Sequence, residues 1–279
     1  SIKYSERARK NFYCAAGEHT LEICFVNREA AFSLFSASAA LTGSLAADAS
    51  PAVAFCVSGG GEYYAVSDDG AVRIFDATLG ELKSFSVKAD RIALSDAGAP
   101  VLFYVSDGKI LCRSVFGQTQ AATLALNAAD FAYMRISASA GAMYFIRDKK
   151  LFRTIINFSN GEATASQETA VDASFSDKAT RVRVPTDENG DSVLVVQGQS
   201  GLYVNGARLR LSGLTDAVFE DGVLKLLLEE NGLASVAYVD GASLRLTEKQ
   251  KVCFCDAACF AGGSSLFVVR DKAVGTENF

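Results

Sequence analysis

The sequence predicts an all-β protein built from a repeated unit of four short antiparallel strands. In the stretch 58–87, the apolar segments 63–67, 71–76 and 82–87 are each bounded by turns rich in Gly or Asp. Strands of this length between such turns are typical of an antiparallel meander and not of helices. A second observation supports this reading, since similar stretches recur along the chain at a regular spacing.

The spacing is marked by an Asp just ahead of an apolar strand, and successive markers lie 40, 42, 44 and 40 residues apart. The markers are Asp90, Asp130, Asp172, Asp216 and Asp256, with Pro51 and Asn11 at the equivalent earlier positions. A period of about 40–45 residues with four strands per unit is that of a propeller blade. The sequence therefore predicts one domain over residues 1–279, a seven-bladed β-propeller.

The predicted blades follow one another without a linker. They cover approximately residues 11–48, 50–88, 89–127, 128–170, 171–212, 213–250 and 251–279. The pair Asn205-Gly206 in the fifth blade favours a type I′ hairpin turn. The last blade supplies only about three strands, so a further strand is needed to complete it.

The stretch DDGAVRIFD (residues 68–76) resembles the strand "DG-T-V-R-I-W-D" of WD-repeat proteins, with Phe75 in place of the usual Trp. The resemblance implies a WD-repeat-type propeller in which the N-terminal residues 1–9 add the outer strand of the last blade and close the ring. It also implies a non-catalytic protein that presents its rim to other proteins, as a scaffold or adaptor in a eukaryotic multiprotein complex.

Residues 68–85 and 90–115 together look like the second and third blades of the endoplasmic-reticulum exchange factor for the coat-protein-II small GTPase. That likeness covers about two of seven blades. It implies a cytosolic propeller followed by a membrane anchor, a small GTPase as partner in vesicle transport, and nucleotide release through a loop of the first blade. The first-blade stretch GEHT (residues 17–20), interpreted as a turn, is much shorter than that loop, which argues against exchange activity.

The amino-acid composition limits the cellular compartments and the classes of partner to be expected. The chain has 27 basic and 32 acidic side chains, 49% hydrophobic residues and seven cysteines. No cluster of Lys and Arg points to nucleic acid, and no apolar run approaches the roughly 20 residues needed to span a bilayer. An odd number of dispersed cysteines fits reduced thiols, so we expect a cytoplasmic protein, on the cytosolic face of an endomembrane if an anchor lies outside this chain.

The recurrent Asp residues have two readings. In the first, each Asp accepts hydrogen bonds from nearby backbone amides and fixes the turn into its strand. In the second, equivalent positions form a ring, so that five carboxylates make one rim acidic and suited to basic peptides or a cation. Turn chemistry alone favours the first.

Turns joining the second and third strands should open on the same rim, and loops on a rigid scaffold are where binding usually resides. The candidate protein-binding residues in these turns are Arg28, Asp68, Asp69, Asp107, Arg147, Lys149, Glu229 and Arg270.

Credible catalytic residues are few. His19 is the only histidine and is placed in a surface turn, so a Ser–His–Asp triad is disfavoured. Cys253, Cys255 and Cys259 lack the usual zinc-ligand spacing and are interpreted as buried thiols of an innermost strand. We therefore predict no enzyme, no metal and no cofactor. A metal-dependent propeller hydrolase using the repeated carboxylates is the alternative from a different class.

Overall fold

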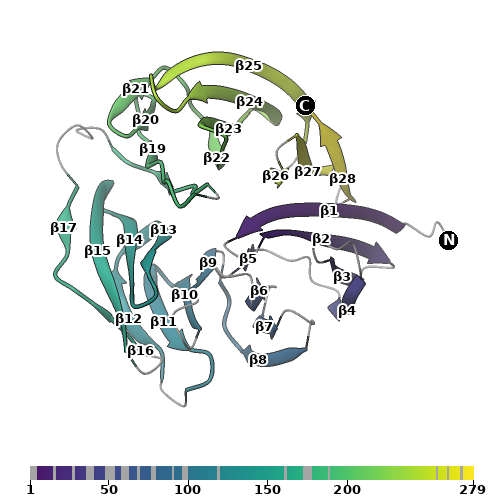
Figure 1. The fold of residues 1–279 in the computed structure, drawn as a ribbon, viewed down its shortest axis with the longest axis vertical. Helices are drawn as coiled ribbons and strands as arrows, with labels where there is room; N and C mark the ends of the chain where they lie inside the picture. The colour runs from purple at the N-terminus through teal and green to yellow at the C-terminus, as the bar shows by residue number, and fades with distance from the viewer. Residues whose placement is uncertain are drawn as a thin grey trace. The chain divides into compact units, whose positions relative to one another are not determined.

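The computed structural model describes residues 5–279 with short gaps. Outside the described residues lie 1–4, 15–16, 27–28, 36–40, 48–53, 58–62, 68–69, 77–79, 90, 96–99, 118–119, 160–161, 172–177, 188, 256, 263 and 271–272. The described elements are all β-strands, as predicted (Figure 1). No helix among them is long and apolar enough to cross a membrane.

The chain divides into two compact units. The first unit comprises Ser1–Tyr13, Glu18–Ala49 and Arg183–Phe279, and the second unit comprises Cys14–Gly17 and Ser50–Val182. In both units the strands form sheets in which each strand except β17 pairs with its neighbour in sequence, the meander that the turns predict.

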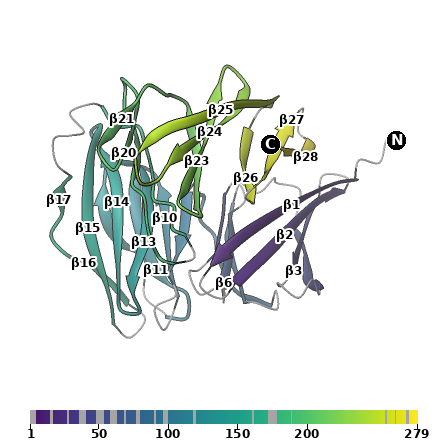
Figure 2. The same ribbon diagram turned by 45° about the horizontal axis from the view of Figure 1, so that its top comes forward.

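Three sheets lie in the second unit. Their strands are β5 (Ala54–Val57), β6 (Tyr63–Ser67), β7 (Val72–Asp76) and β8 (Glu81–Phe85); β9 (Arg91–Leu94), β10 (Val101–Ser106), β11 (Lys109–Ser114) and β12 (Ala122–Leu126); and β13 (Ala128–Ser137), β14 (Ala140–Arg147), β15 (Lys150–Ser159), β16 (Glu162–Ala165) and β17 (Thr169–Ala170). Figure 2 shows β13, β14 and β15 side by side. Both β16 and β17 pair with β15, so the outermost strand of this sheet is broken into two pieces.

The remaining sheets belong largely to the first unit. Their strands are β1 (Ser5–Cys14), β2 (Gly17–Val26), β3 (Glu29–Phe35) and β4 (Leu41–Ala47); β18 (Arg181–Arg183), β19 (Val195–Gln197), β20 (Leu202–Val204) and β21 (Ala207–Leu209); β22 (Leu214–Glu220), β23 (Val223–Glu230), β24 (Leu233–Asp240) and β25 (Arg245–Phe254); and β26 (Ala257–Gly262), β27 (Ser265–Arg270) and β28 (Ala273–Asn278). The described strands thus make seven sheets, five of them four-stranded.

Apolar cores lie between consecutive sheets, because successive side chains of a strand point to opposite faces. In β10, Val101 and Phe103 join a core shared with β13–β15, whereas Leu102 and Tyr104 join a core shared with β6 and β7. In the first unit, Leu226 and Leu228 of β23 face one core and Leu227 faces another. Central strands are therefore buried on both faces, which fixes their register.

Two details differ from the sequence prediction. The prediction that residues 1–9 form a strand of the last sheet is not confirmed, because Ser5–Cys14 is one continuous strand of the first sheet and the described part of the last sheet has three strands. The stretch 17–20 with His19 is not a turn, since β2 begins at Gly17. In the sequence, polar Glu18, Thr20 and Glu22 alternate with Leu21 and Ile23, a period of two that favours a strand.

Candidate functional site

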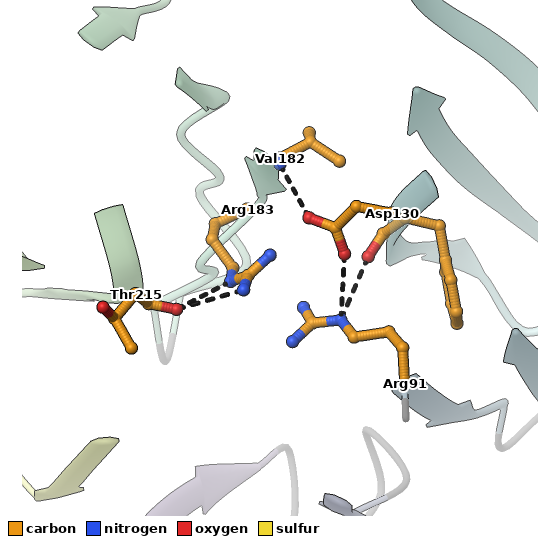
Figure 3. A network of polar contacts seen from close by, with 6 residues as sticks. Arg91, Asp130, Val182, Arg183 and Thr215 are labelled. Carbon is orange, nitrogen blue, oxygen red and sulfur yellow. Dashed lines mark hydrogen bonds and ion pairs between the residues drawn. The ribbon is translucent and has the colours of Figure 1, made fainter. Parts of the chain in front are cut away.

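Asp130 links two strands that are distant in sequence. Its carboxylate oxygen Oδ2 accepts a hydrogen bond of 3.0 Å from the backbone N–H of Val182 in β18, and the Asp130 side chain is buried (Figure 3). The pairing of β13 with β14 shifts between Ala128 and Asp130, a β-bulge that re-aims side chains. β18 is the end strand of its sheet, so its outward N–H groups need partners from outside the ladder. The Asp130 carboxylate is the acceptor for one of these groups, the N–H of Val182.

The Arg91 side chain contacts the same carboxylate and the backbone next to it. Its Nε lies 3.6 Å from Asp130 Oδ1 and donates a hydrogen bond of 3.2 Å to the backbone carbonyl of Phe131 (Figure 3). Arg91 begins β9 and Phe131 lies in β13, so the guanidinium joins the first strands of two sheets. Sequence reasoning missed Arg91, although it directly follows the repeat marker Asp90.

Asp216 repeats this arrangement within the first unit. The pairing of β22 with β23 shifts between Leu214 and Asp216, and Asp216 Oδ2 accepts a hydrogen bond of 3.0 Å from the backbone N–H of Phe260 in β26. Its Oδ1 accepts a local hydrogen bond from Ala217. Arg183 donates from Nε and Nη2 to the backbone carbonyl of Thr215, at 3.3 and 3.0 Å. The described markers thus connect the first strands of different sheets.

These contacts revise the reading of the repeated Asp residues. Asp130 and Asp216 lie inside their strands and not ahead of them, and their main partners are distant backbone amides. Asp90, Asp172 and Asp256 lie outside the described residues. The first strand of the fifth sheet, β18, begins only at Arg181, well after Asp172.

Three of the described turns between second and third strands are tight. Asp107-Gly108, Asp148-Lys149 and Asn231-Gly232 all have two positive φ angles, as a type I′ turn requires, and Asn205-Gly206 between β20 and β21 does too, as predicted. The second residue of each of the first three turns offers its carbonyl to the segment entering the next sheet. The N–H of Ala128 donates to the Gly108 carbonyl at 2.8 Å, and the N–H of Ala179 donates to the Lys149 carbonyl at 2.7 Å. The N–H of Cys255 donates to the Gly232 carbonyl at 2.8 Å. We call the ends of the second unit's sheets where the Asp107-Gly108 and Asp148-Lys149 turns lie the turn edge.

The predicted binding residues have different surroundings. Asp107 and Lys149 are exposed on the turn edge, and Glu229 is half-buried. Arg147 is half-buried too, because its guanidinium lies 4.3 Å over the ring of Phe152 and pairs with Glu168 at 2.7 Å. Arg28, Asp68 and Asp69 lie outside the described residues, and Arg270 is described only as the last backbone position of β27.

The prediction that Cys253, Cys255 and Cys259 lie together in one innermost strand is wrong. Cys253 lies in β25, Cys255 follows the end of that strand, and Cys259 lies in β26, because β25 stops at Phe254. In the described part of the chain, Cys112 and Cys253 are free thiols, Cys255 is buried, and no group of three or more His, Cys, Asp or Glu side chains is placed to hold a metal.

Comparison with known proteins finds the fold but no family. No family model and no curated protein matches this chain. Among solved structures, the β-propeller domain of Cps50 (Swd1) from Myceliophthora thermophila has a TM-score of 0.66 at 10% identity and covers 100% of this chain and 98% of that one. The yeast heterotrimeric Nup82-Nup159-Nup116 nucleoporin complex matches with a TM-score of 0.62 at 8% identity over 97% of both chains.

Another similar structure is an enzyme, the hydrazine synthase of Kuenenia stuttgartiensis, with a TM-score of 0.59, 11% identity and coverage of 96% and 94%. Identities this low establish the fold alone. The chain is an all-β protein with a β-propeller fold.

Proposed function

We propose that this chain is a seven-bladed propeller of the WD-repeat type that acts as a non-catalytic scaffold for protein–protein interaction in a eukaryotic multiprotein complex. Its proposed compartment is the cytoplasm. The partners are proteins or peptides that dock on the turn edge, which carries Asp107 and Lys149.

The observation that carries the proposal is the anchoring of this edge. Each of its two tight turns is hydrogen-bonded through its carbonyl to the segment entering the next sheet. The backbone of such turns is fixed, and binding residues are commonly found on loops that a rigid scaffold positions. The carboxylates of Asp130 and Asp216 are already used in contacts between strands, which leaves them poorly suited to catalysis or metal binding.

The similar structures support this at the level of fold. The Swd1 structure is a β-propeller domain. The Nup82-Nup159-Nup116 structure is a complex of several proteins. One fold hosts many functions, so this support is an analogy. The two alternatives, an exchange factor for a small GTPase and a metal-dependent hydrolase, predict different outcomes of the experiment below.

The test is affinity purification of the tagged full-length protein, read by mass spectrometry, with Asp107→Lys compared with Asp221→Lys. Both residues are exposed and occupy the first position of an Asp-Gly turn with positive φ. Asp107 lies on the turn edge, whereas Asp221 joins β22 to β23 at the opposite end of its sheet. We expect Asp107→Lys to lose partners that Asp221→Lys retains.

Equal partner sets for both variants would contradict docking at the turn edge. A small GTPase as the dominant partner would direct the next assay to nucleotide release. Recovery of the protein without partners but with a bound metal would contradict the scaffold and favour the hydrolase.

A further inference from the structure

The segment 162–171, which forms the outer side of the β13–β17 sheet, contains one residue too many for a regular ladder. It pairs with β15 in two pieces, with Ala165 of β16 opposite Ile156 and Thr169 of β17 opposite Arg153 (Figure 1). Between these two pairs β15 advances by three residues and the 162–171 segment by four. An extra residue of this kind is a β-bulge, which interrupts the pairing.

The 162–171 segment adds little to the apolar core. None of its side chains is buried, and only Ala163, Glu168 and Val171 are half-buried. The strand that it covers, β15, by contrast buries Leu151 and Ile156 among others. Segments with few buried apolar contacts open at a low cost in free energy. We therefore expect the 162–171 segment to open locally while the core on the other side of β15 stays intact.

The contacts on both sides of the bulge are polar. The N–H of Ser166 donates to the Ile155 carbonyl at 2.8 Å, and the Thr154 hydroxyl donates to the Ser166 carbonyl at 2.9 Å. The N–H of Val171 donates to the Leu151 carbonyl at 3.0 Å. Water or another strand can replace such hydrogen bonds, so their net contribution to holding this particular segment is small.

One cation is bound to the segment but is held in place by β15. Arg147 lies 4.3 Å over the ring of Phe152, and that ring stacks on Phe145 with 5.6 Å between the ring centroids. The ion pair of Arg147 with Glu168, at 2.7 Å, is the contribution of the 162–171 segment. When this segment opens, the rings still position the guanidinium. A guanidinium in a fixed position favours a carboxylate, which accepts charge-assisted hydrogen bonds from it.

We infer that the 162–171 segment is exchangeable, and that the freed edge of β15 pairs with an extended segment of a partner protein that brings a carboxylate to Arg147. The inference rests on the proposed scaffold function and adds a second binding surface to it. This surface adjoins the turn edge, because β15 begins at Lys150, directly after the Asp148-Lys149 turn.

Strand addition suits this edge. When a peptide adds to the edge of a sheet, main-chain hydrogen bonds supply affinity and side chains supply specificity. A partner segment without the extra residue continues the ladder along the whole of β15, whereas the 162–171 segment is interrupted. The carboxylate that meets Arg147 then selects among such segments.

The first measurement is hydrogen exchange of the full chain. The amides of Ser166 and Val171 should exchange at least about tenfold faster than the amide of Ala128, which donates to the Gly108 carbonyl at 2.8 Å. Exchange as slow as that of Ala128 would show that the segment does not open, and would overturn the inference.

The second measurement is fluorescence anisotropy of a labelled peptide with the sequence of residues 162–171 without Gln167. We expect saturable binding to the full chain, because this peptide pairs with β15 without a bulge. A control peptide with Glu168→Gln should bind at least about threefold more weakly, since it lacks the carboxylate for Arg147. A chain from which Gln167 is deleted should bind the first peptide at least about tenfold more weakly, because its own segment then forms the regular ladder.

Three results of the peptide assay would overturn the inference: no binding of the first peptide, equal binding of both peptides, or equal binding by the natural chain and the deletion variant. None of them depends on Asp107 or Asp221. A partner set lost in Asp107→Lys together with a failed peptide assay would retain the scaffold and reject strand exchange.

Discussion

The carboxylate of Asp130 in β13 accepts a hydrogen bond from the main-chain N–H of Val182 in β18, at 3.0 Å and 52 residues away in sequence. Asp216 makes the same contact with Phe260 across 44 residues. Both Asp residues lie at a β-bulge, and both amides belong to a strand at the end of its sheet.

Asp130→Ala should lower the free energy of unfolding by about 2 kcal/mol, because a buried N–H loses its acceptor and Arg91 loses a partner. Urea denaturation monitored by circular dichroism measures this. Asp191→Ala is the control, since Asp191 is exposed, and should change stability by less than about 0.5 kcal/mol. Equal stability of both variants would show that the Asp130 contact contributes nothing.

Asp216→Ala should expose one particular amide. Phe260 N–H is bonded to Asp216 Oδ2, so its hydrogen exchange should accelerate by roughly tenfold or more in the variant. The amide of Glu229, which donates to the Gly213 carbonyl, serves as an internal reference. Unchanged protection of Phe260 would mean that another group accepts from it.

Gly213→Ala and Gly222→Ala should differ sharply. Both glycines have positive φ, at 79° and 74°, so each substitution costs about 1 kcal/mol for the backbone alone. A Cβ on Gly213 would lie 2.2 Å from the Glu229 carbonyl oxygen, whereas a Cβ on Gly222 meets nothing within 4 Å. We expect Gly213→Ala to lose about 2 kcal/mol more than Gly222→Ala in thermal unfolding. Similar losses would show that the strand pair adjusts freely.

The free energy of unfolding should decrease at alkaline pH because of the buried thiol of Cys112. Burial raises the pKa of this thiol from 9.0 to about 11. Between those values the unfolded chain releases a proton that the folded chain keeps, so the free energy of unfolding decreases as pH rises and the contribution is complete below pH 9. The stability advantage of the natural protein over Cys112→Ala should therefore shrink from pH 9 to 11. A constant difference in urea midpoints would contradict this.

Local features were predictable and long-range contacts were not. The positions of β6, β7, β10 and β11 follow from alternation and from Asp-Gly or Asn-Gly turns, because turn chemistry acts over two residues. The marker at Asp172 does not align with the first strand of its sheet, since β18 begins later than a regular period allows. The contact of Asp130 could not be read from sequence, because its partner is a main-chain N–H that any residue except proline provides.

The contacts of residues 178–182 were missed for a related reason, because only the hydrogen bonds of Ala179 to the Lys149 carbonyl and of Val182 to Asp130 join this segment to residues so distant in sequence. The Asp repeat was visible, but its use in joining strands was not, since the same residue type also caps turns.

The nature of these contacts bears on how far such a chain can diverge. In each Asp contact only one side is a particular side chain, because the other is an amide whose donor survives nearly every substitution. Mutations can therefore accumulate in the receiving strand without a matching change in the Asp, and paired replacement is not required. A fold whose sheets are joined in this way can keep its geometry while its sequence diverges, consistent with solved structures that resemble it at 8–11% identity.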